Sequence, residues 1–440
     1  MLLIGEVVLG LLIPFYMADV IDKGIVGGDK SYIFLMGFKM ILMSLGSALC
    51  GVVAARLSAV ATMGLGASLR KEMYDRIQDY SFSNIDKFST ASLVTRMTTD
   101  ITTVQNVYLM LIRQLFRAPV ELALAFFLTI KISKQVAGTF LVIIPVLLLF
   151  LVMLAPMAVR KFKKVFKMFD GLNSSIQENL IGIRVVKSFV RGKFEKDKFA
   201  VANDGLTNAS IGSNMIVVSA MPFMMGVFYF AILAVNLIGS KLILNGQMEI
   251  GKLTTITTYV VQILVALVNV AVIAVSYFMS RASTVRILEV IKEQPDINDS
   301  DADDAVDITT GSVSFNKVSF KYDKNSKGYD LENLNFEIKA GETIGIIGAT
   351  GCGKTTLVSL IPRLYDVSEG KILIDGIELS KYKLKTLRDK ISVVLQKSTL
   401  FSKSVRENLL WGNEIATEDD IKEAMEIACA TEFIKGLPNG

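Results

Sequence analysis

The chain has 440 residues, of which 52% are hydrophobic and only 20% are charged, with a net charge of +5. Soluble domains are typically ~45–50% apolar and ~25% charged, so this composition favours a membrane protein. The sequence contains no histidine, which excludes histidine acid–base chemistry and most zinc sites. The three cysteines, Cys50, Cys352 and Cys429, lie far apart in the sequence, so we expect neither a disulfide framework nor a cysteine metal site.

Six apolar stretches are long enough to cross a bilayer, which takes ~20 helical residues. Lipid offers no hydrogen-bond partner to the backbone, so helices are the natural structure for them. A buried core helix is the alternative for any one stretch, but six together favour a membrane domain. The predicted spans are residues 1–21, 32–57, 107–131, 135–156, 214–239 and 253–279.

The connections between these spans alternate in length and charge. The short ones are residues 22–30, 131–135 and 239–252, whereas the two long ones are basic. Positive charge favours the cytosolic side, so the long connections and the C-terminal residues are predicted to be cytosolic. Both long connections keep helical character, which predicts helices that extend beyond the bilayer.

A few polar residues fall inside the predicted spans. Glu6, Lys39 and Glu121 are ionisable, and Gln262 and Asn269 are neutral. Intramembrane ionisable groups are costly and often functional, although they can also be structural, and Lys39 can reach an interface by snorkelling. We treat Glu121, Gln262 and Asn269 as candidates for a substrate cavity.

The second half of the chain changes character after the last span. Residues 291–311 are acidic and polar and are predicted to form a linker. Residues 312–320 and 331–338 alternate like strands. The segment "ETIGIIGATGCGKTTLVSLIPRLY" (342–365) then predicts an apolar strand, a glycine-rich loop and a helix.

The loop matches the GxxxxGK[ST] pattern of a P-loop through Gly348, Gly353, Lys354 and Thr355. The glycines let backbone N–H groups turn toward phosphates without a side-chain clash. Lys354 supplies a positive charge to the β- and γ-phosphates, and the Thr355 hydroxyl is a ligand for Mg²⁺. The pattern therefore predicts MgATP binding.

Together, these features resemble an ATP-binding cassette (ABC) exporter half-transporter over almost the whole chain. "VSFKY" (318–322) resembles the opening strand of the family's nucleotide-binding domain, and "SVVLQKSTLFSKSVRENL" (392–409) resembles its Q-loop region. "FSTASLVTRMTTDITTVQ" (88–105) and "QENLIGIRVVKSFVRGKFEKDKF" (177–199) resemble its first and second intracellular loops.

The resemblance implies roles for individual residues. Lys354 and Gln396 would act in catalysis, Thr355 and Gln396 would contact Mg²⁺, and Tyr322 would stack on adenine. The implied nucleotide-binding residues are Tyr322, Gly348, Thr350, Gly351, Cys352, Gly353, Lys354, Thr355, Thr356 and Gln396.

The family pattern breaks off after "TEFIKGLPNG" (431–440). The resemblance leads us to expect a signature loop, a catalytic glutamate and a switch histidine, and none of them lies in these residues. The usual basic elbow helix before the first span is also not present. We therefore expect a truncated view of a longer protein, in which residues 1–440 bind ATP without hydrolysing it efficiently.

The predicted fold is an α-helical membrane domain (1–290), a linker (291–311) and the first part of an α/β P-loop NTPase domain (312–440). The predicted function is that of a subunit of an ATP-driven exporter for a small amphipathic or lipid-like substrate. The subunit would pair with a second half-transporter in a bacterial plasma membrane, with its nucleotide-binding domain in the cytosol. A non-catalytic, ATP-binding regulatory subunit of a heterodimer is the alternative. Membrane lipid and a small-molecule, lipid or peptide substrate are the other expected partners, and no nucleic-acid partner is expected. The substrate and the choice between homodimer and heterodimer stay open.

Overall fold

The computed structural model describes residues 1–324, 326–396 and 399–437. The chain forms two compact units. The first comprises Met1–Tyr80 and Asn84–Gln294, and the second comprises Ser81–Ser83 and the residues from Pro295 onward. The boundary after Gln294 lies inside the predicted linker.

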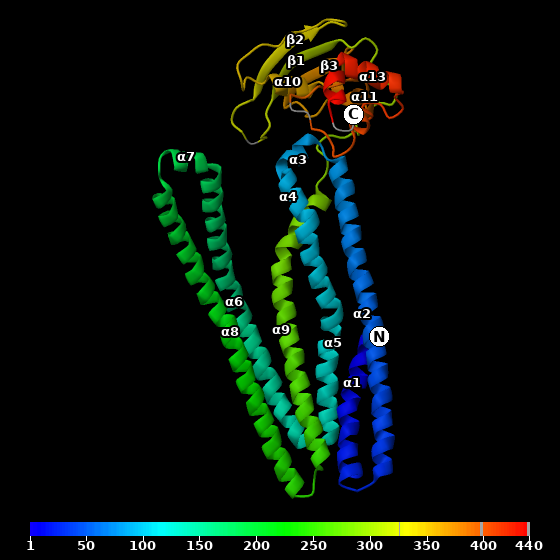
Figure 1. Cartoon of the computed structure of the whole chain (residues 1–440), viewed down its shortest axis with the longest axis vertical. Coiled ribbons are helices and arrows are strands. Elements are labelled where there is room, and N and C mark those ends of the chain that lie inside the picture. The colour runs from blue at the N-terminus through cyan, green and yellow to red at the C-terminus, as the bar shows by residue number, and fades with distance from the viewer. Residues whose placement is uncertain (325, 397–398, 438–440) are drawn as a thin grey trace. The chain divides into compact units, whose positions relative to one another are not determined.

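The first unit consists of helices, several of them very long (Figure 1). Five helices carry most of its length: α2 (Lys30–Asp79), α5 (Ile101–Ile132), α6 (Lys134–Ile181), α8 (Gly192–Leu244) and α9 (Ile250–Lys292). The remaining elements are α1 (Leu2–Asp19), η1 (Val20–Ile25), α3 (Phe82–Phe88), α4 (Thr90–Thr95), η2 (Arg96–Asp100) and α7 (Ile183–Ser188). Helix α2 has 50 residues, which corresponds to ~75 Å, so it extends well beyond a ~30 Å hydrocarbon core.

Five helices in the described part of the chain are long and apolar enough to cross a membrane. They cover the predicted spans 1–21, 32–57, 135–156, 214–239 and 253–279. The sixth predicted span, 107–131, lies in α5 and does not meet the same criterion, because Arg113, Arg117 and Glu121 add charge to that helix. The crossing by α5 therefore stays a prediction.

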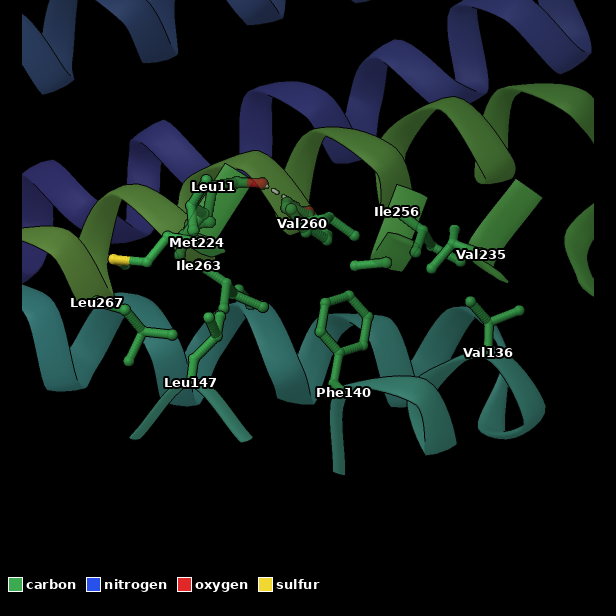
Figure 2. Packing of buried hydrophobic residues seen from close by; sticks show 14 of the residues in the cluster. Leu11, Val136, Phe140, Leu147, Met224, Val235, Ile256, Val260, Ile263 and Leu267 are labelled. Atoms are coloured by element: carbon green, nitrogen blue, oxygen red, sulfur yellow. Dashed lines mark hydrogen bonds between the residues drawn. The ribbon is translucent and has the colours of Figure 1, made fainter. Parts of the chain in front are cut away.

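Apolar packing holds the helices of the first unit together. Val136, Phe140 and Leu147 lie on α6, and their side chains point toward Ile256, Val260 and Ile263 of α9 (Figure 2). Helices α6 and α8 run side by side and are joined through α7, and α5 runs beside α9 (Figure 1).

The second unit is built on a four-stranded antiparallel sheet with the order β2-β1-β3-β4. Its strands are β1 (Val313–Phe320), β2 (Leu331–Ile338), β3 (Glu369–Ile374) and β4 (Ile377–Glu378). Its helices are α10 (Lys354–Leu360), η3 (Leu379–Lys381), α11 (Leu384–Lys390), α12 (Val405–Leu409), α13 (Glu418–Ile427) and α14 (Thr431–Lys435). Phe315 of β1, Leu360 of α10 and Leu387 of α11 lie in one buried cluster, which packs the P-loop helix against the sheet.

The strand predicted just before the P-loop is not formed. Residues 342–349 have no regular secondary structure, and Ile344 and Ile347 are exposed. A strand needs a hydrogen-bonded neighbour, and within the described residues no other segment pairs with this one. The prediction was therefore wrong for this segment, although β1 and β2 form where the alternating pattern predicted strands.

Candidate nucleotide-binding site and intramembrane polar cluster

The P-loop conformation depends on glycine at two positions. Gly351 has φ +86° and Gly353 has φ +88°, a region that other residues rarely adopt. A Cβ on Gly353 would also lie 2.5 Å from Leu331 Cδ2. The loop can therefore turn tightly at Gly353 only because no side chain is present there.

Lys354 is the first residue of α10, directly after this turn. Its Nζ donates hydrogen bonds to the carbonyl oxygens of Gly348 and Ala349, both at 2.8 Å. The Cys352 Sγ lies 3.7 Å from the same Nζ. The ammonium group is thus held over the loop itself, where it can meet phosphate oxygens.

The two threonines after Lys354 differ in burial. Thr355 is exposed, so its hydroxyl is available as a metal ligand, whereas Thr356 is buried. The Thr356 Oγ1 lies 3.1 Å from the hydroxyl of Tyr322. The site thus combines three features: a turn without side chains, an ammonium group and an exposed hydroxyl. Together they fit a nucleoside triphosphate with Mg²⁺.

Tyr322 is brought to the P-loop helix by this hydrogen bond. Its ring packs edge-on against Phe320 and Tyr365, with centroids 4.8 Å and 5.1 Å away. The side chain is still 49% exposed, so one part of the ring can contact a planar ligand. The sequence did not predict the supporting roles of Phe320 and Tyr365, because aromatic contacts between distant segments leave no local signal.

Gln396 is not brought to the loop by any hydrogen bond within the described residues, and its side chain is exposed. Residues 397–398, in the Q-loop region, lie outside the described part of the chain. The proposed contact of Gln396 with Mg²⁺ therefore stays a prediction.

In the membrane part, Glu6 and Glu121 are joined through Arg117. Arg117 Nη1 lies 2.7 Å from Glu6 Oε1, and Arg117 Nε lies 3.5 Å from Glu121 Oε2. Both carboxylates are mostly buried, with 16% and 13% of their side chains exposed. Arg117 was not among the residues predicted from the sequence, although its spacing of four residues from Glu121 on one helix could have shown the pair.

Gly51 of α2 packs closely against this cluster, because a Cβ there would lie 3.2 Å from Glu6 Cδ. The cluster connects α1, which carries Glu6, with α5. An ion pair inside a membrane domain compensates charges that would otherwise be costly to bury. The pairing therefore gives Glu121 a structural partner in addition to its candidate role in a cavity.

Gln262 lies on the face of α9 that meets α1. Thr255 and Tyr259 on this face donate to the carbonyl oxygens of Pro14 and Leu11, at 2.6 Å and 2.8 Å. Gln262 follows Thr255 by two helical turns, and its Oε1 is buried without a hydrogen-bond partner in the described structure. Asn269 is half-buried. Within the described residues, no hydrogen bond or ion pair joins Glu121, Gln262 and Asn269 directly, so their common cavity stays a prediction.

A third group of contacts ties η2 to α9 at their predicted cytosolic ends. Arg286 donates to both carboxylate oxygens of Asp100, and its Nε lies 2.8 Å from Oδ2. The hydrogen bonds from Arg286 lower the pKa of Asp100, whose side chain is 3% exposed. Tyr80 donates to the carbonyl oxygen of Val290 at 2.5 Å. The segment 80–100, part of the predicted first intracellular loop, is thereby fixed to α9.

The fold and the P-loop define a membrane protein with a fused nucleotide-binding unit. Comparison with known families agrees: residues 1–267 match the family model for the ABC transporter transmembrane region, and residues 331–437 match the family model for ABC transporter. The chain belongs to the ABC transporter family, as a half-transporter with a transmembrane domain fused to a nucleotide-binding domain.

Similar proteins come from several bacteria. The chain is 34% identical over 439 residues to the uncharacterized ABC transporter ATP-binding protein YfiB of Bacillus subtilis, covering 100% of this chain and 76% of the relative. It is 30% identical over 442 residues to the uncharacterized protein Rv1273c of Mycobacterium tuberculosis, covering 99% and 75%. It is 29% identical over 393 residues to an ATP-dependent lipid A-core flippase of Syntrophus aciditrophicus, covering 89% and 65%.

Proposed function

We propose that the chain is a subunit of an ATP-driven exporter that moves a small amphipathic or lipid-like substrate across the bacterial plasma membrane. It would act as a dimer with a second half-transporter, by alternating access. The observation that carries this proposal is the P-loop, with Lys354 held over a turn that excludes side chains, in the same chain as apolar helices of membrane length.

The residues of the site support a specific set of contacts with ATP. The Lys354 ammonium exchanges the carbonyl oxygens of Gly348 and Ala349 for β- and γ-phosphate oxygens, while backbone N–H groups of the loop bind the same phosphates. The Thr355 hydroxyl would hold Mg²⁺, which neutralises phosphate charge when bound. The ring of Tyr322, supported by Phe320 and Tyr365, would stack on the adenine.

The substrate class rests on the membrane part and on one relative. Glu121, Gln262 and Asn269 offer polar groups inside otherwise apolar helices, which suits a molecule with both polar and apolar parts. The flippase relative is named for a lipid substrate, lipid A-core. Lipid-like molecules are therefore the first substrates to test.

The first test replaces Lys354 by Ala in the protein as the cell produces it. Without the ammonium group, ATP-dependent transport into inverted membrane vesicles should fall by about 100-fold or more. Lys390→Ala removes an exposed lysine of the same unit and should leave transport unchanged. Undiminished ATP-dependent transport in the Lys354 variant would refute the proposal.

We also propose that residues 1–440 by themselves bind MgATP without efficient turnover. In the family that the chain resembles, a glutamate activates the attacking water, and the motif that carries it is not among residues 1–440; hydrolysis depends on such a group. Binding of a fluorescent ATP analogue and release of inorganic phosphate should be measured on the same sample. Saturable binding with phosphate release near the buffer background is expected, and turnover typical of ABC transporters would contradict it.

A further inference from the structure

Five basic residues follow the apolar part of α6 within eight positions: Arg160, Lys161, Lys163, Lys164 and Lys167. All five side chains are exposed. Within the part of the chain that the structure describes, none of them forms an ion pair. The next acidic residue along the helix is Asp170. Neither the transport cycle nor the nucleotide site gives this positive charge a role.

Some cations on the helical extensions of this unit do have carboxylate partners. Lys198 pairs with Glu178 at 2.8 Å, in the same α6–α8 hairpin. Lys87 and Arg96 pair with Glu293 and Glu289, at 2.8 Å and 2.9 Å. The basic group on α6 differs from these three cations, because within the described residues none of its five members has a carboxylate partner.

Four of the five cations share one face of the helix. At 100° per residue, Arg160, Lys163, Lys164 and Lys167 lie within an arc of about 100°, and Lys161 lies about 60° outside it. Continued toward the N-terminus of α6, the same face carries Leu149, Val152 and Met153. These three apolar side chains are 63%, 69% and 61% exposed.

The position along the helix sets the level of the charges in a bilayer. Helix α6 begins at Lys134, and ~20 residues cross the hydrocarbon core, so the apolar part ends near residue 156. Arg160 to Lys167 then lie ~6–17 Å further along the helix, at and just beyond the headgroup layer. Lysine and arginine can reach back several ångströms by snorkelling.

We infer that this face of α6, defined by Arg160, Lys161, Lys163, Lys164 and Lys167, is a binding site for anionic phospholipid headgroups of the cytosolic leaflet. The exposed apolar side chains of Leu149, Val152 and Met153 contact the acyl chains, and the ammonium and guanidinium groups contact the phosphates. Basic clusters directly cytosolic of a membrane helix attract anionic lipid because each cation lies within a Debye length of the surface. The site is separate from the nucleotide-binding residues and needs no ATP.

The test compares two variants with the same loss of charge in nucleotide-free protein reconstituted into bilayers. Lys163→Gln, Lys164→Gln and Lys167→Gln together remove the centre of the site. Lys187→Gln, Lys193→Gln and Lys196→Gln together remove three exposed lysines at least twenty residues further along the chain, far beyond the headgroup layer. The association of spin-labelled phosphatidylglycerol relative to phosphatidylcholine is measured by electron paramagnetic resonance.

The preference for phosphatidylglycerol should fall about threefold or more in the α6 variant and stay unchanged in the control. It should also weaken in about 0.5 M salt for the unmodified protein, and a Lys→Arg version of the α6 variant should retain it. Equal preference in all variants would overturn the inference. So would a change in oligomeric state with lipid preference intact, since the face would then bind an acidic protein segment. Thermal unfolding of each variant checks that the fold is kept.

Discussion

The carboxylate of Asp375 accepts backbone hydrogen bonds from four consecutive residues, Thr309, Thr310, Gly311 and Ser312, at 2.8–2.9 Å. Burial alone would raise its pKa, but the hydrogen bonds from Thr310, Thr309 and Ser312 outweigh that effect and lower the pKa. This single side chain fixes the end of the predicted linker to the turn between β3 and β4.

The lowered pKa gives Asp375 a defined pH signature. A carboxyl group whose folded pKa lies below its unfolded value of ~3.9 stabilises the fold above that value, and the stabilisation is lost as pH falls below it. Asp375→Asn should therefore lower the melting temperature of the second unit by about 3 °C at pH 7, and the difference should shrink below about pH 4.

The single tryptophan, Trp411, lies in the second unit and stacks on Phe401 with centroids 4.3 Å apart, so its fluorescence reports this unfolding. Asp419→Asn is the control, because that side chain is 91% exposed and pairs only with Lys422. A destabilisation by Asp375→Asn that is equally large at acid pH would contradict the charge-based explanation.

Among the structural elements, η2 and α9 depend on the Asp100–Arg286 pair. Asp100 is almost fully buried, so removing Arg286 leaves a carboxylate without its main partner. Arg286→Gln should lower the melting temperature of the first unit by about 4 °C or more. Arg286→Lys should recover only part of this loss, because lysine cannot bind both carboxylate oxygens as a guanidinium does.

The matched comparison is the Lys23–Asp19 pair, at 2.9 Å between the end of α1 and η1, in which the Lys23 side chain is 59% exposed. Lys23→Gln should shift the melting temperature by less than about 1 °C, since exposed pairs contribute little. Size-exclusion chromatography after heating, in one detergent for all variants, measures both shifts. Similar shifts in melting temperature for Arg286→Gln and Lys23→Gln would show that the Asp100–Arg286 pair stabilises the first unit no more than the Lys23–Asp19 pair does.

Sequence patterns predicted the elements that depend on local signals. The long apolar runs predicted the helices, alternation predicted β1 and β2, and the glycine spacing predicted the P-loop turn. The prediction of a strand before the loop was wrong, because a strand also needs a hydrogen-bonded neighbour, and the residues of the segment itself do not specify that neighbour. Arg117 was missed because its partner Glu6 lies 111 residues away in the sequence, although Glu121 lies only one turn away.

The linker shows the same limit for the whole molecule. Its composition predicted a linker over 291–311, but not the individual contacts that hold residues 299–311 to the second unit. Asp299 accepts a hydrogen bond from the Leu384 N–H at 2.9 Å, Asp303 N–H donates to the Lys381 carbonyl at 2.9 Å, and Asp304 pairs with Lys383 at 2.8 Å. The acidic residues of this segment thus attach it to the second unit, through a lysine and through the start of a helix, and do not merely keep it solvated.

This attachment predicts that residues 299–312 resist proteolysis in the folded protein. Proteinase K should cleave slowly within residues 299–312, because the second unit holds them through these contacts. Mass spectrometry of the early fragments locates the cuts. First cuts within 303–312 would contradict the attachment, and Lys383→Gln should shift cleavage toward Asp304 if the pair contributes to it.

Helix α2 runs through 50 residues without a proline, whereas α6 contains Pro145 and Pro156 and α8 contains Pro222. Proline removes a backbone hydrogen bond and permits bending, so α2 is the stiffer element. A stiff rod ~75 Å long that tilts by about 10° around its centre moves each end by ~6 Å, more than one helical turn. The helix can thus serve as a lever arm. A small rotation near its cytosolic end displaces its opposite end far enough to open or close a passage there.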